Sequence, residues 1–319
     1  MKSWSRIFLF VAIAASFGVS IFANRIDDYY LDILLNIGIN IILAVSLNLV
    51  NGHTGQFSLG HAGFMAVGAY TAASLTLFLG APILHLLGGE NTFSTAILFL
   101  LALSAGGLAA AGAGLLVGVP SLRLRGDYLA IVTLGFNEII RVVLQNTNAV
   151  GGARGLNGIA NYTNFFWTFS LAALTIYVIA SLVDSTYGRG FLAVRDDEIA
   201  AEAMGINTTK FKVIAFVIGA FFAGIAGGLY AHFRRYITPE GFNFLKSVDV
   251  VVMVILGGMG STQGVLLAAI VLTVLNEFLR QFEQYRMVIF SLLLIIMMIL
   301  RPQGLIGDLK WLRRRRKTS

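Results

Sequence analysis

The chain has 319 residues, of which 57% are hydrophobic and 12% are charged, and its formal net charge is +7. Soluble domains typically carry about 25% charged residues, so this composition excludes an ordinary soluble protein. Apolar runs of about twenty residues, the length of a membrane-crossing helix, recur without the alternation of barrel strands. We therefore expect an all-α polytopic membrane protein with a single transmembrane domain over residues 1–319.

The polar residues exclude several further classes of protein. The chain has no cysteine, which rules out disulfides, thiolate chemistry and cysteine metal sites. Its four histidines show no metal-binding spacing, and we predict neither a metal site nor a catalytic set. The positive charges lie at the boundaries of the apolar runs, which favours cytoplasmic loops and tails over nucleic-acid binding.

Hydrophobic runs predict the membrane segments in chain order. They are 5–23, 31–50, 57–79, 95–119, 128–146, 165–183, 211–233, 248–279 and 286–300. The stretch 248–279 is too long for one span and contains GGMGSTQG (257–264), so we interpret it as two segments that meet at a glycine-rich turn. Ten crossings result, with eight crossings plus a re-entrant pair as the alternative. The first run also resembles a signal peptide, but its length and the spans that follow favour a retained helix.

Basic residues predict the orientation of these segments. Lys2 and Arg6 precede the first segment, and the tail 308–319 carries six positive charges. Both termini are therefore expected in the cytoplasm, which requires an even number of crossings. The connections expected inside are 123–127, 184–212 and 257–264, and those expected outside are 81–94 and 147–164. Arg234 and Arg235 then fall on the outer side, against the rule.

Small residues recur at every fourth position in segment 211–233. The two neighbouring rows are Ala215, Gly219, Ala223, Gly227 and Ala231, and Ala220, Gly224 and Gly228. Ala110, Gly114 and Gly118 repeat the spacing in segment 95–119. This spacing lets helix backbones approach closely in lipid, so it predicts helices that pack tightly on one another within one domain.

A charged island interrupts the apolar chain at 184–212, with nine charged residues. Asp196 can cap a helix, Asp197 and Glu198 then fall in its first turn, and Gly205 supplies a stop signal. The pattern predicts a short helix of two or three turns, with acids on one side and small apolar residues on the other. A solvated connecting loop is the alternative, but exposed small residues on a helix suit docking into a groove of another protein.

Several long motifs, the island among them, are similar to those of one transporter family. They are LNLVNGHTGQFSLGHAGFMAVGAYTAA (47–73), SLRLRGDYLAIVTLGFNEIIRVVLQN (121–146), GGARGLNGI (151–159), RDDEIAAEAMGINTTKFKVIAFVIGAFFAGIAGGL (195–229), VVVMVILGGMGSTQGVLLAA (250–269) and RPQGLIG (301–307). They resemble the M-type permease subunit of branched-chain amino-acid ABC importers, in order, from about residue 31 onward. The resemblance implies a type II-like ABC importer permease.

The resemblance also implies that the island holds a coupling helix, which contacts the ATPase. Its residues would be Asp196, Asp197, Glu198, Ile199, Ala200, Ala201, Glu202, Ala203 and Gly205. The family pattern is E-A-A followed three residues later by G. This sequence fits only with an extra Ile199 between the acid and the alanines, which puts in doubt which residue enters the ATPase groove but not where the helix lies.

The same resemblance implies an assembly in a bacterial cytoplasmic (inner) membrane. Members pair with a second homologous permease subunit and two cytoplasmic ATP-binding subunits, and a periplasmic or lipid-anchored binding protein delivers the amino acid. The sequence agrees in one respect, because it has no Gly-Lys pair and therefore no P-loop. We expect no cofactor on this chain, no enzymatic activity of its own, and ATP and Mg on the partner subunits.

Polar residues inside the spans predict a translocation path, because such residues are costly in lipid and often functional. The candidates are Asn40, Asn48, Gln56, His61, Tyr70, Thr133, Asn137 and Glu138. Glu138 and Arg141 stand at i, i+3, so a structural pair is the alternative to a role in the path. For His61 the alternative is a satisfied contact between helices.

Two questions stay open at the level of the sequence. Leucine, isoleucine and valine are the default substrates, but relatives carry urea, short amides or other amino acids. An ion-coupled secondary transporter that uses Glu138 or Asp249 is a different mechanism for the same architecture. It would show a pH-dependent flux that is lost in Glu138→Gln while the island is dispensable.

Overall fold

The computed structural model describes residues 2–22, 27–121 and 127–282, with isolated positions between 285 and 299. The described chain is mostly helical. The long helices are α1 (Lys2–Phe22), α2 (Asp28–Asn48), α3 (His61–Phe78), α5 (Thr92–Ser121), α6 (Asp127–Asn146), α7 (Phe165–Val183), α10 (Thr208–Arg234), α11 (Phe244–Gly257) and α12 (Thr262–Phe278). The short helices are α4 (Gly80–Leu86), α8 (Thr186–Asp196) and α9 (Glu198–Ala203).

Short turns and two strands complete the described chain. The π-helical turn η2 (Leu49–His53) continues α2. The 3-10 turns are η3 (Asn148–Val150), η4 (Gly152–Arg154), η5 (Pro239–Phe242) and η6 (Leu279–Phe282). Strand β1 (Leu156–Asn157) pairs antiparallel with β2 (Tyr236–Ile237), with Leu156 opposite Ile237.

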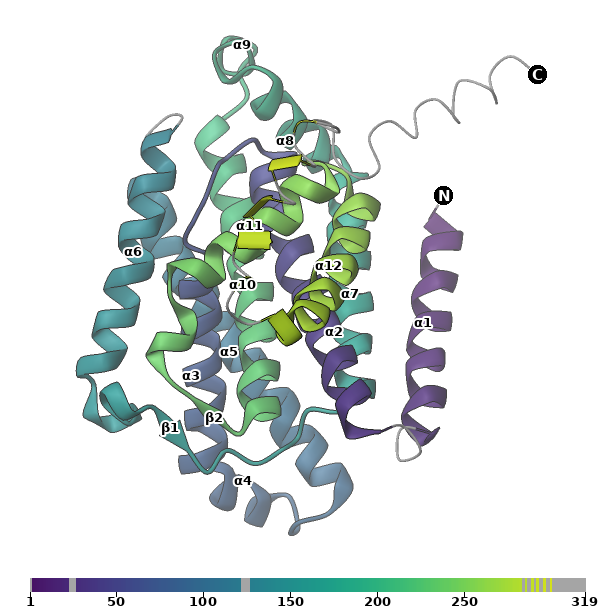
Figure 1. Ribbon diagram of the computed structural model, residues 1–319. Coiled ribbons are helices and arrows are strands. Elements are labelled where there is room, and N and C mark those ends of the chain that lie inside the picture. Colours follow the sequence, from purple (N-terminus) through teal and green to yellow (C-terminus); the bar gives the residue numbers. More distant parts are fainter. Residues whose placement is uncertain are drawn as a thin grey trace.

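Successive long helices run in alternating directions, which gives the molecule two ends (Figure 1). The α9 end carries α8, α9 and the turn between α11 and α12, and the α4 end carries α4, β1 and β2. Segments 184–212 and 257–264 thus share one end, and 81–94 and 147–164 share the other, as the sequence predicts. Most of 123–127 and the tail 308–319 lie outside the described residues.

Five described helices are long and apolar enough to cross a membrane, or six if the bent pair α3–α4 counts as one span. The predicted stretch 248–279 does divide in two, at the turn that separates α11 from α12. These helices have 14 and 17 residues, fewer than the roughly twenty that a span needs. Most of 286–300 lies outside the described residues. The described chain therefore offers several candidate spans, and the count of ten or eight crossings stays a prediction.

The predicted segments 31–50 and 57–79 need correction where they meet. The helical path from α2 continues through η2 to His53, and α3 begins only at His61. Residues 54–60 between them are not helical. Gly55 has a φ of +69°, a left-handed conformation that ends a right-handed helix and favours glycine. We call residues 49–60, from η2 to the start of α3, the polar break.

The core forms where α10 packs against α3 and α5. A β-carbon at Gly68 in α3 would overlap the backbone of Gly224 in α10, and one at Gly227 would overlap the carbonyl of Met65. A β-carbon at Gly224 would also come within 2.7 Å of the Gly106 carbonyl oxygen in α5. The predicted rows of small residues therefore form the contact surface. In lipid no hydrophobic driving force brings helices together, so direct packing of their backbones supplies the attraction.

Candidate functional site

The charged island folds into two helices, α8 and α9, which together with the following turn we call the coupling segment (186–207), after the role that the resemblance implies for it. The predicted cap is wrong by one residue. Asp197, with extended φ and ψ of −160° and 109°, accepts hydrogen bonds from the Ile199 and Ala200 amides at 2.9 and 3.0 Å. Asp196 instead ends α8 and forms an ion pair with Arg195 at 3.0 Å.

Helix α9 has six residues, less than the predicted two or three turns because 3.6 residues make one turn. Gly205, at φ +81°, ends it as predicted. The Gly205 amide bonds to the Glu202 carbonyl and the Ile206 amide to the Ala201 carbonyl, which is the Schellman pattern. Ile206 lies beyond the end of the helix.

Both acids of α9 have partners at the start of α10, although Glu202 is exposed. Glu198 forms a 2.6 Å ion pair with Lys212 in the first turns of α10, and Glu202 accepts a 2.7 Å hydrogen bond from the Thr208 hydroxyl. The opposite side is apolar and exposed: Ile199 is 68% exposed, and Ala200 and Ala203 are exposed beside it. The coupling segment is therefore joined firmly to α10 and presents small apolar side chains outward.

Arg195 links the coupling segment to the polar break. Its Nη1 lies 3.4 Å from the Gly52 carbonyl oxygen, a long contact. A β-carbon at Gly55 would lie 3.0 Å from Arg195 Cγ, and one at Gly260 would lie 3.1 Å from Arg195 Nη1. One side chain thus contacts both the break and the α11–α12 turn. The sequence carries no local signal for this contact, because its partners lie far away along the chain.

Four of the predicted path residues lie in or against the polar break, and three have at least one partner, although Asn48 Nδ2 has none within the described residues. Asn48 Oδ1 accepts a hydrogen bond from the Gly260 amide at 2.9 Å. Thr133 Oγ1, on α6, accepts from the Leu59 amide at 3.0 Å. His61 Nε2 lies 2.9 Å from Ser46 Oγ, which is the satisfied contact between helices that the sequence left open.

The fourth, Gln56, belongs to a buried set that lacks hydrogen-bond partners within the described residues. Both amide atoms of Gln56 and of Asn137, on α6, are in this state, as are both ring nitrogens of His53. A buried polar atom without a partner costs about 1–3 kcal/mol, so such a group in a native protein calls for an explanation. Asn137 lies against the first turn of α3, since a β-carbon at Gly63 would come within 3.0 Å of its Oδ1.

Two other predicted path residues lie elsewhere. The Tyr70 hydroxyl is 3.5 Å from the Ile237 carbonyl oxygen, toward the α4 end. Asn40, in α2, donates to the Thr273 hydroxyl at 3.0 Å and lines a separate cavity with α11 and α12. The sequence list therefore mixes residues of the break with residues that serve other parts of the fold.

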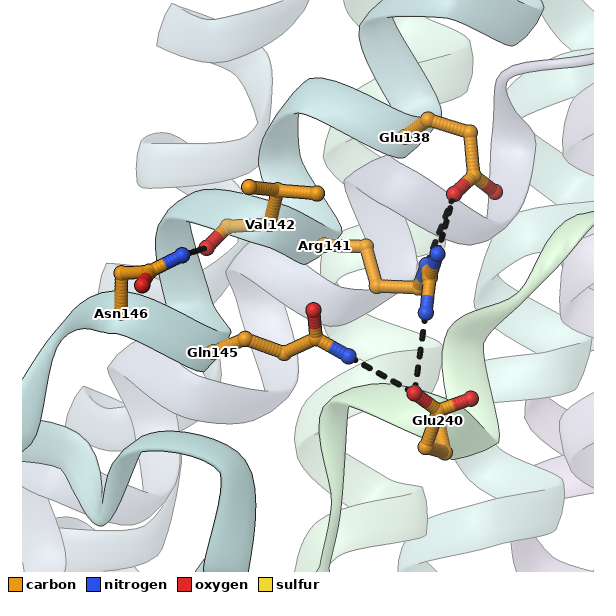
Figure 2. A network of polar contacts seen from close by, with 6 residues as sticks. All are labelled: Glu138, Arg141, Val142, Gln145, Asn146 and Glu240. Atoms are coloured by element: carbon orange, nitrogen blue, oxygen red, sulfur yellow. Dashed lines mark hydrogen bonds and ion pairs between the residues drawn. The ribbon is translucent and has the colours of Figure 1, made fainter.

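Glu138 belongs to an ion network at the edge of α6 (Figure 2). Arg141 Nη2 lies 2.7 Å from Glu138 Oε2, and Arg141 Nη1 lies 2.9 Å from Glu240 Oε1 in η5. Gln145 donates to the same Glu240 oxygen at 2.7 Å. The i, i+3 pair is thus present, and it extends to a second carboxylate, Glu240, that the sequence did not indicate. This network joins α6 to the α10–α11 connection.

Comparison with known proteins places this chain in a protein family. The model of the branched-chain amino acid transport system / permease component family matches residues 29–300. The chain belongs to this permease family. The family membership and the long apolar helices together make it a multi-pass membrane protein and a transport permease component.

Several curated relatives of this permease are similar over long stretches. The high-affinity branched-chain amino acid transport system permease protein LivM of Escherichia coli K12 is 40% identical over 309 residues, covering 86% of this chain and 67% of the relative. LivM of Salmonella typhimurium is 39% identical over the same coverage. The LivH permease protein of E. coli K12 is 30% identical over 140 residues, covering 43% of this chain and 44% of LivH. No solved structure matches the chain.

Proposed function

We propose that this permease is the transmembrane subunit of an ATP-driven ABC importer for leucine, isoleucine and valine. The 40% identity to LivM over most of the chain is the observation that carries the proposal. The similarity to LivH, a second permease protein of the same kind of transport system, supports a pair of homologous permeases. The two ATP-binding subunits, with ATP and Mg, and the periplasmic or lipid-anchored binding protein would complete the assembly.

In this proposal α9 docks into a groove of an ATP-binding subunit. Its exposed side offers Ile199, Ala200 and Ala203, side chains short enough to fit between helices of a partner. The α9 end would then face the cytoplasm of a bacterial inner membrane, with both termini on that side. Arg234 and Arg235 would stay on the outer side, where Arg234 forms an ion pair with Asp32 at 3.8 Å.

Closure of the ATP-binding subunits would move α9, and the protein offers two routes for that motion. The Glu198–Lys212 ion pair connects α9 to α10, the central helix of the core. The contact of Arg195 with Gly52 connects the coupling segment to the polar break. A movement at α9 would thereby reach the buried polar side chains between α2, α3 and α6.

Ile199→Arg in the complete transporter, reconstituted in proteoliposomes, tests this function. We expect ATP-dependent leucine uptake to be lost and the ATP-binding subunits to stop co-purifying, while the two permeases still assemble. Leu86→Arg is the matched control, because Leu86 is a similarly exposed apolar residue (89%) at the α4 end. Uptake that continues unchanged in Ile199→Arg, or a wild-type chain that transports alone down an ion gradient, would overturn the proposal.

The transported solute is tested in the same vesicles by competition. Excess isoleucine and valine should compete with labelled leucine, whereas urea and short amides should not. An ion-coupled mechanism through Glu138 is not favoured, because Arg141 holds that carboxylate in an ion pair. A proton gradient that replaces ATP as the energy source would reverse this preference.

A further inference from the structure

The connection between α10 and α11 leaves the α4 end and runs back into the depth of the spans. In η5, the Phe242 ring meets the Tyr70 ring, near the middle of α3, at a centroid distance of 6.2 Å. A few residues later Lys246, beside the cavity that Asn40 lines, has its Nζ 3.4 Å from Asn40 Oδ1, near the middle of the span Asp28–His53. The turn η5 therefore lies beside membrane-crossing helices although it is not α-helical itself.

Part of this connection is exposed at membrane depth. Glu240 and Gly241 in η5 are exposed, and the Arg141–Glu240 ion pair joins η5 to α6 (Figure 2). Arg141 lies five residues before the end of α6, which at 1.5 Å per residue is about 7.5 Å inside the helix end. Irregular backbone at such a depth does not face lipid, because it must be buried by protein or border water. The α6 side of η5 therefore needs a cover that the described residues do not supply.

The same side of α6 carries charge in the middle of a span. Glu138 is the twelfth of the 20 residues of α6, and its side chain is 37% exposed although it pairs with Arg141. An ionised side chain that faces lipid at this depth is costly, and an ion pair offsets that cost only in part. Gln145 adds a half-buried amide one turn after Arg141. This side of α6 therefore suits contact with protein or water and not with hydrocarbon.

Helix α7 is exposed to the same extent but carries no such charges. In each of these two helices 22% of the apolar window is buried, against 67% in α10. The sequence of α7 contains no charged residue, and α1 packs on it, with the Ser16 and Ser170 hydroxyls 2.9 Å apart. An apolar surface of this kind can face lipid. Among the candidate spans of the described chain, α6 alone combines low burial with charge in its middle.

Next to its charged side, α6 presents an apolar stripe to the outside. The exposed residues of this stripe recur at intervals of three or four and so share one side of the helix: Tyr128, Ile131, Gly135, Ile139 and Val142. At Gly135, in the middle of the stripe, a β-carbon would meet nothing within 4 Å among the described residues. The name α6 face is used below for this stripe together with Glu138, Arg141, Gln145 and Glu240.

We propose that the α6 face is the surface on which this chain contacts the second permease subunit. The apolar stripe packs against that subunit. Glu138, Arg141 and Glu240 lie at the edge of the contact, where water between the two subunits hydrates them. The inference rests on the proposed pair of homologous permeases and adds the surface by which the two meet.

The depth of the α6 face selects this partner among the proposed ones. The ATP-binding subunits and the binding protein lie outside the bilayer and reach only the two ends of the helical bundle. A face in the middle of a span is accessible only to lipid or to another membrane-embedded chain, and its charges disfavour lipid. The similarity to LivH favours a homologous permease over a second copy of this chain.

Gly135→Leu in the complete transporter tests the contact, with Gly112→Leu as the matched control. Both glycines are exposed in apolar spans, and a β-carbon at either meets nothing within 4 Å among the described residues. A leucine at position 135 should hold the second permease away, so the amount of it that co-purifies with the tagged chain should fall at least about fivefold. Gly112→Leu should retain it. Size-exclusion chromatography should show folded tagged chain in both variants.

Photo-crosslinking provides a second measurement that does not depend on a disruptive substitution. The crosslinker p-benzoylphenylalanine replaces either Ile139 on the stripe, which is 56% exposed, or Leu108 on α5, which is 65% exposed and serves as the control. Ile139 comes 12 residues after the start of α6 and Leu108 comes 13 residues before the end of α5, so the two lie at similar depth. Illumination of proteoliposomes should join position 139, and not position 108, to the second permease, as mass spectrometry of the product would show.

The outcomes separate this inference from the proposed function. If the wild-type transporter contains no second permease, or imports no branched-chain amino acid with ATP, the proposed function fails. If it does both, but position 139 crosslinks only to lipid or to a second copy of this chain, the inference fails and the proposed function stands. Retention of the second permease by Gly135→Leu at the level of Gly112→Leu would also overturn the inference. If Gly135→Leu yields no folded chain, the crosslink at position 139 decides.

Discussion

The core around α10 and the polar break are built in opposite ways. In the core, glycine and alanine bring the backbones of α3, α5 and α10 into direct contact. In the break, a π-helical turn and a non-helical stretch surround buried amides and a histidine that lack partners within the described residues. A closely packed core does not deform gradually: it keeps one arrangement or switches to another. Polar side chains, in contrast, can exchange one hydrogen-bond partner for another. The comparison indicates a stiff element beside an adaptable one, both connected to the coupling segment.

The largest effect is expected from a side chain placed in the core contact. In Gly227→Leu the new β-carbon would overlap the Met65 carbonyl and come within 2.9 Å of the Ala69 amide nitrogen, both backbone atoms of α3. We expect the free energy of unfolding to fall by at least about 3 kcal/mol. This is the upper end of the effects of overpacking, because backbone atoms, unlike side chains, cannot rotate away from the clash. Size-exclusion chromatography of the detergent-solubilised permease should show little folded protein.

Gly112→Leu is the matched control for this substitution. Gly112 lies in α5, but a β-carbon there meets nothing within 4 Å. The same change of residue should therefore leave the elution profile intact. If both variants assemble equally, the small-residue contacts are not the source of the stiffness that the comparison assigns to the core.

The next effect concerns the link between the coupling segment and the break. Arg195→Met removes the contact with Gly52 while the Glu198–Lys212 pair stays in place. We expect the number of leucine molecules transported per ATP hydrolysed to fall about two- to thirty-fold. This range corresponds to the loss of a coupling energy of about 0.5–2 kcal/mol. Parallel assays of uptake and phosphate release in the same vesicles measure this ratio.

Arg189→Met, an exposed arginine on the same helix, is the control for Arg195 and should keep the wild-type ratio. An unchanged ratio in Arg195→Met would mean that motion reaches the membrane through α10 alone. The break would then follow the core passively, and the contrast between the two regions would lose its functional meaning.

Local patterns allowed much of this fold to be predicted from the sequence. Hydrophobic runs located the long helices, four-residue spacing located the contact rows of α10, and glycines located the turn between α11 and α12. The cap of α9 was missed by one residue because Asp196 and Asp197 are both good caps. Only backbone conformation decides between them, and it is Asp197 that is extended.

Contacts between distant segments could not be predicted in the same way. The pairing of Arg141 with Glu240, the approach of Arg195 to Gly52, and the cavity around Lys246 each join parts of the chain that no periodicity relates. The π-helical turn after α2 was also not predicted, because Leu49 and Val50 continue the apolar run and the polar residues after them do not distinguish a π-helical turn from the end of a helix. Among these features, the proposed transport route depends on the approach of Arg195 to Gly52 and on the π-helical turn.

A substitution in α6, where Asn137 lies against the first turn of α3, should separate stability from function. Asn137→Leu replaces a buried amide, neither atom of which has a partner within the described residues, by an apolar side chain of similar size. Because the desolvation cost of the amide is removed, the free energy of unfolding should stay unchanged or rise by about 1 kcal/mol. The melting temperature should accordingly not fall. Leucine uptake should nevertheless fall. A variant that is more stable and fully active would show that the buried amide has no role in transport.

The smallest effect is expected at the ion network of Figure 2, which lies outside both regions of the comparison. Arg141→Gln leaves Glu138 and Glu240 without their shared cation, but the Glu240 side chain is 66% exposed and solvent screens the loss. We expect a destabilisation of about 0.2–1 kcal/mol, seen as a small drop in melting temperature, with uptake near wild type. Gln145→Met, which removes only the neutral partner of Glu240, should do less. A large loss of uptake at unchanged melting temperature would instead assign Glu138 and Arg141 to the transport route, and would extend the adaptable region from the break along α6.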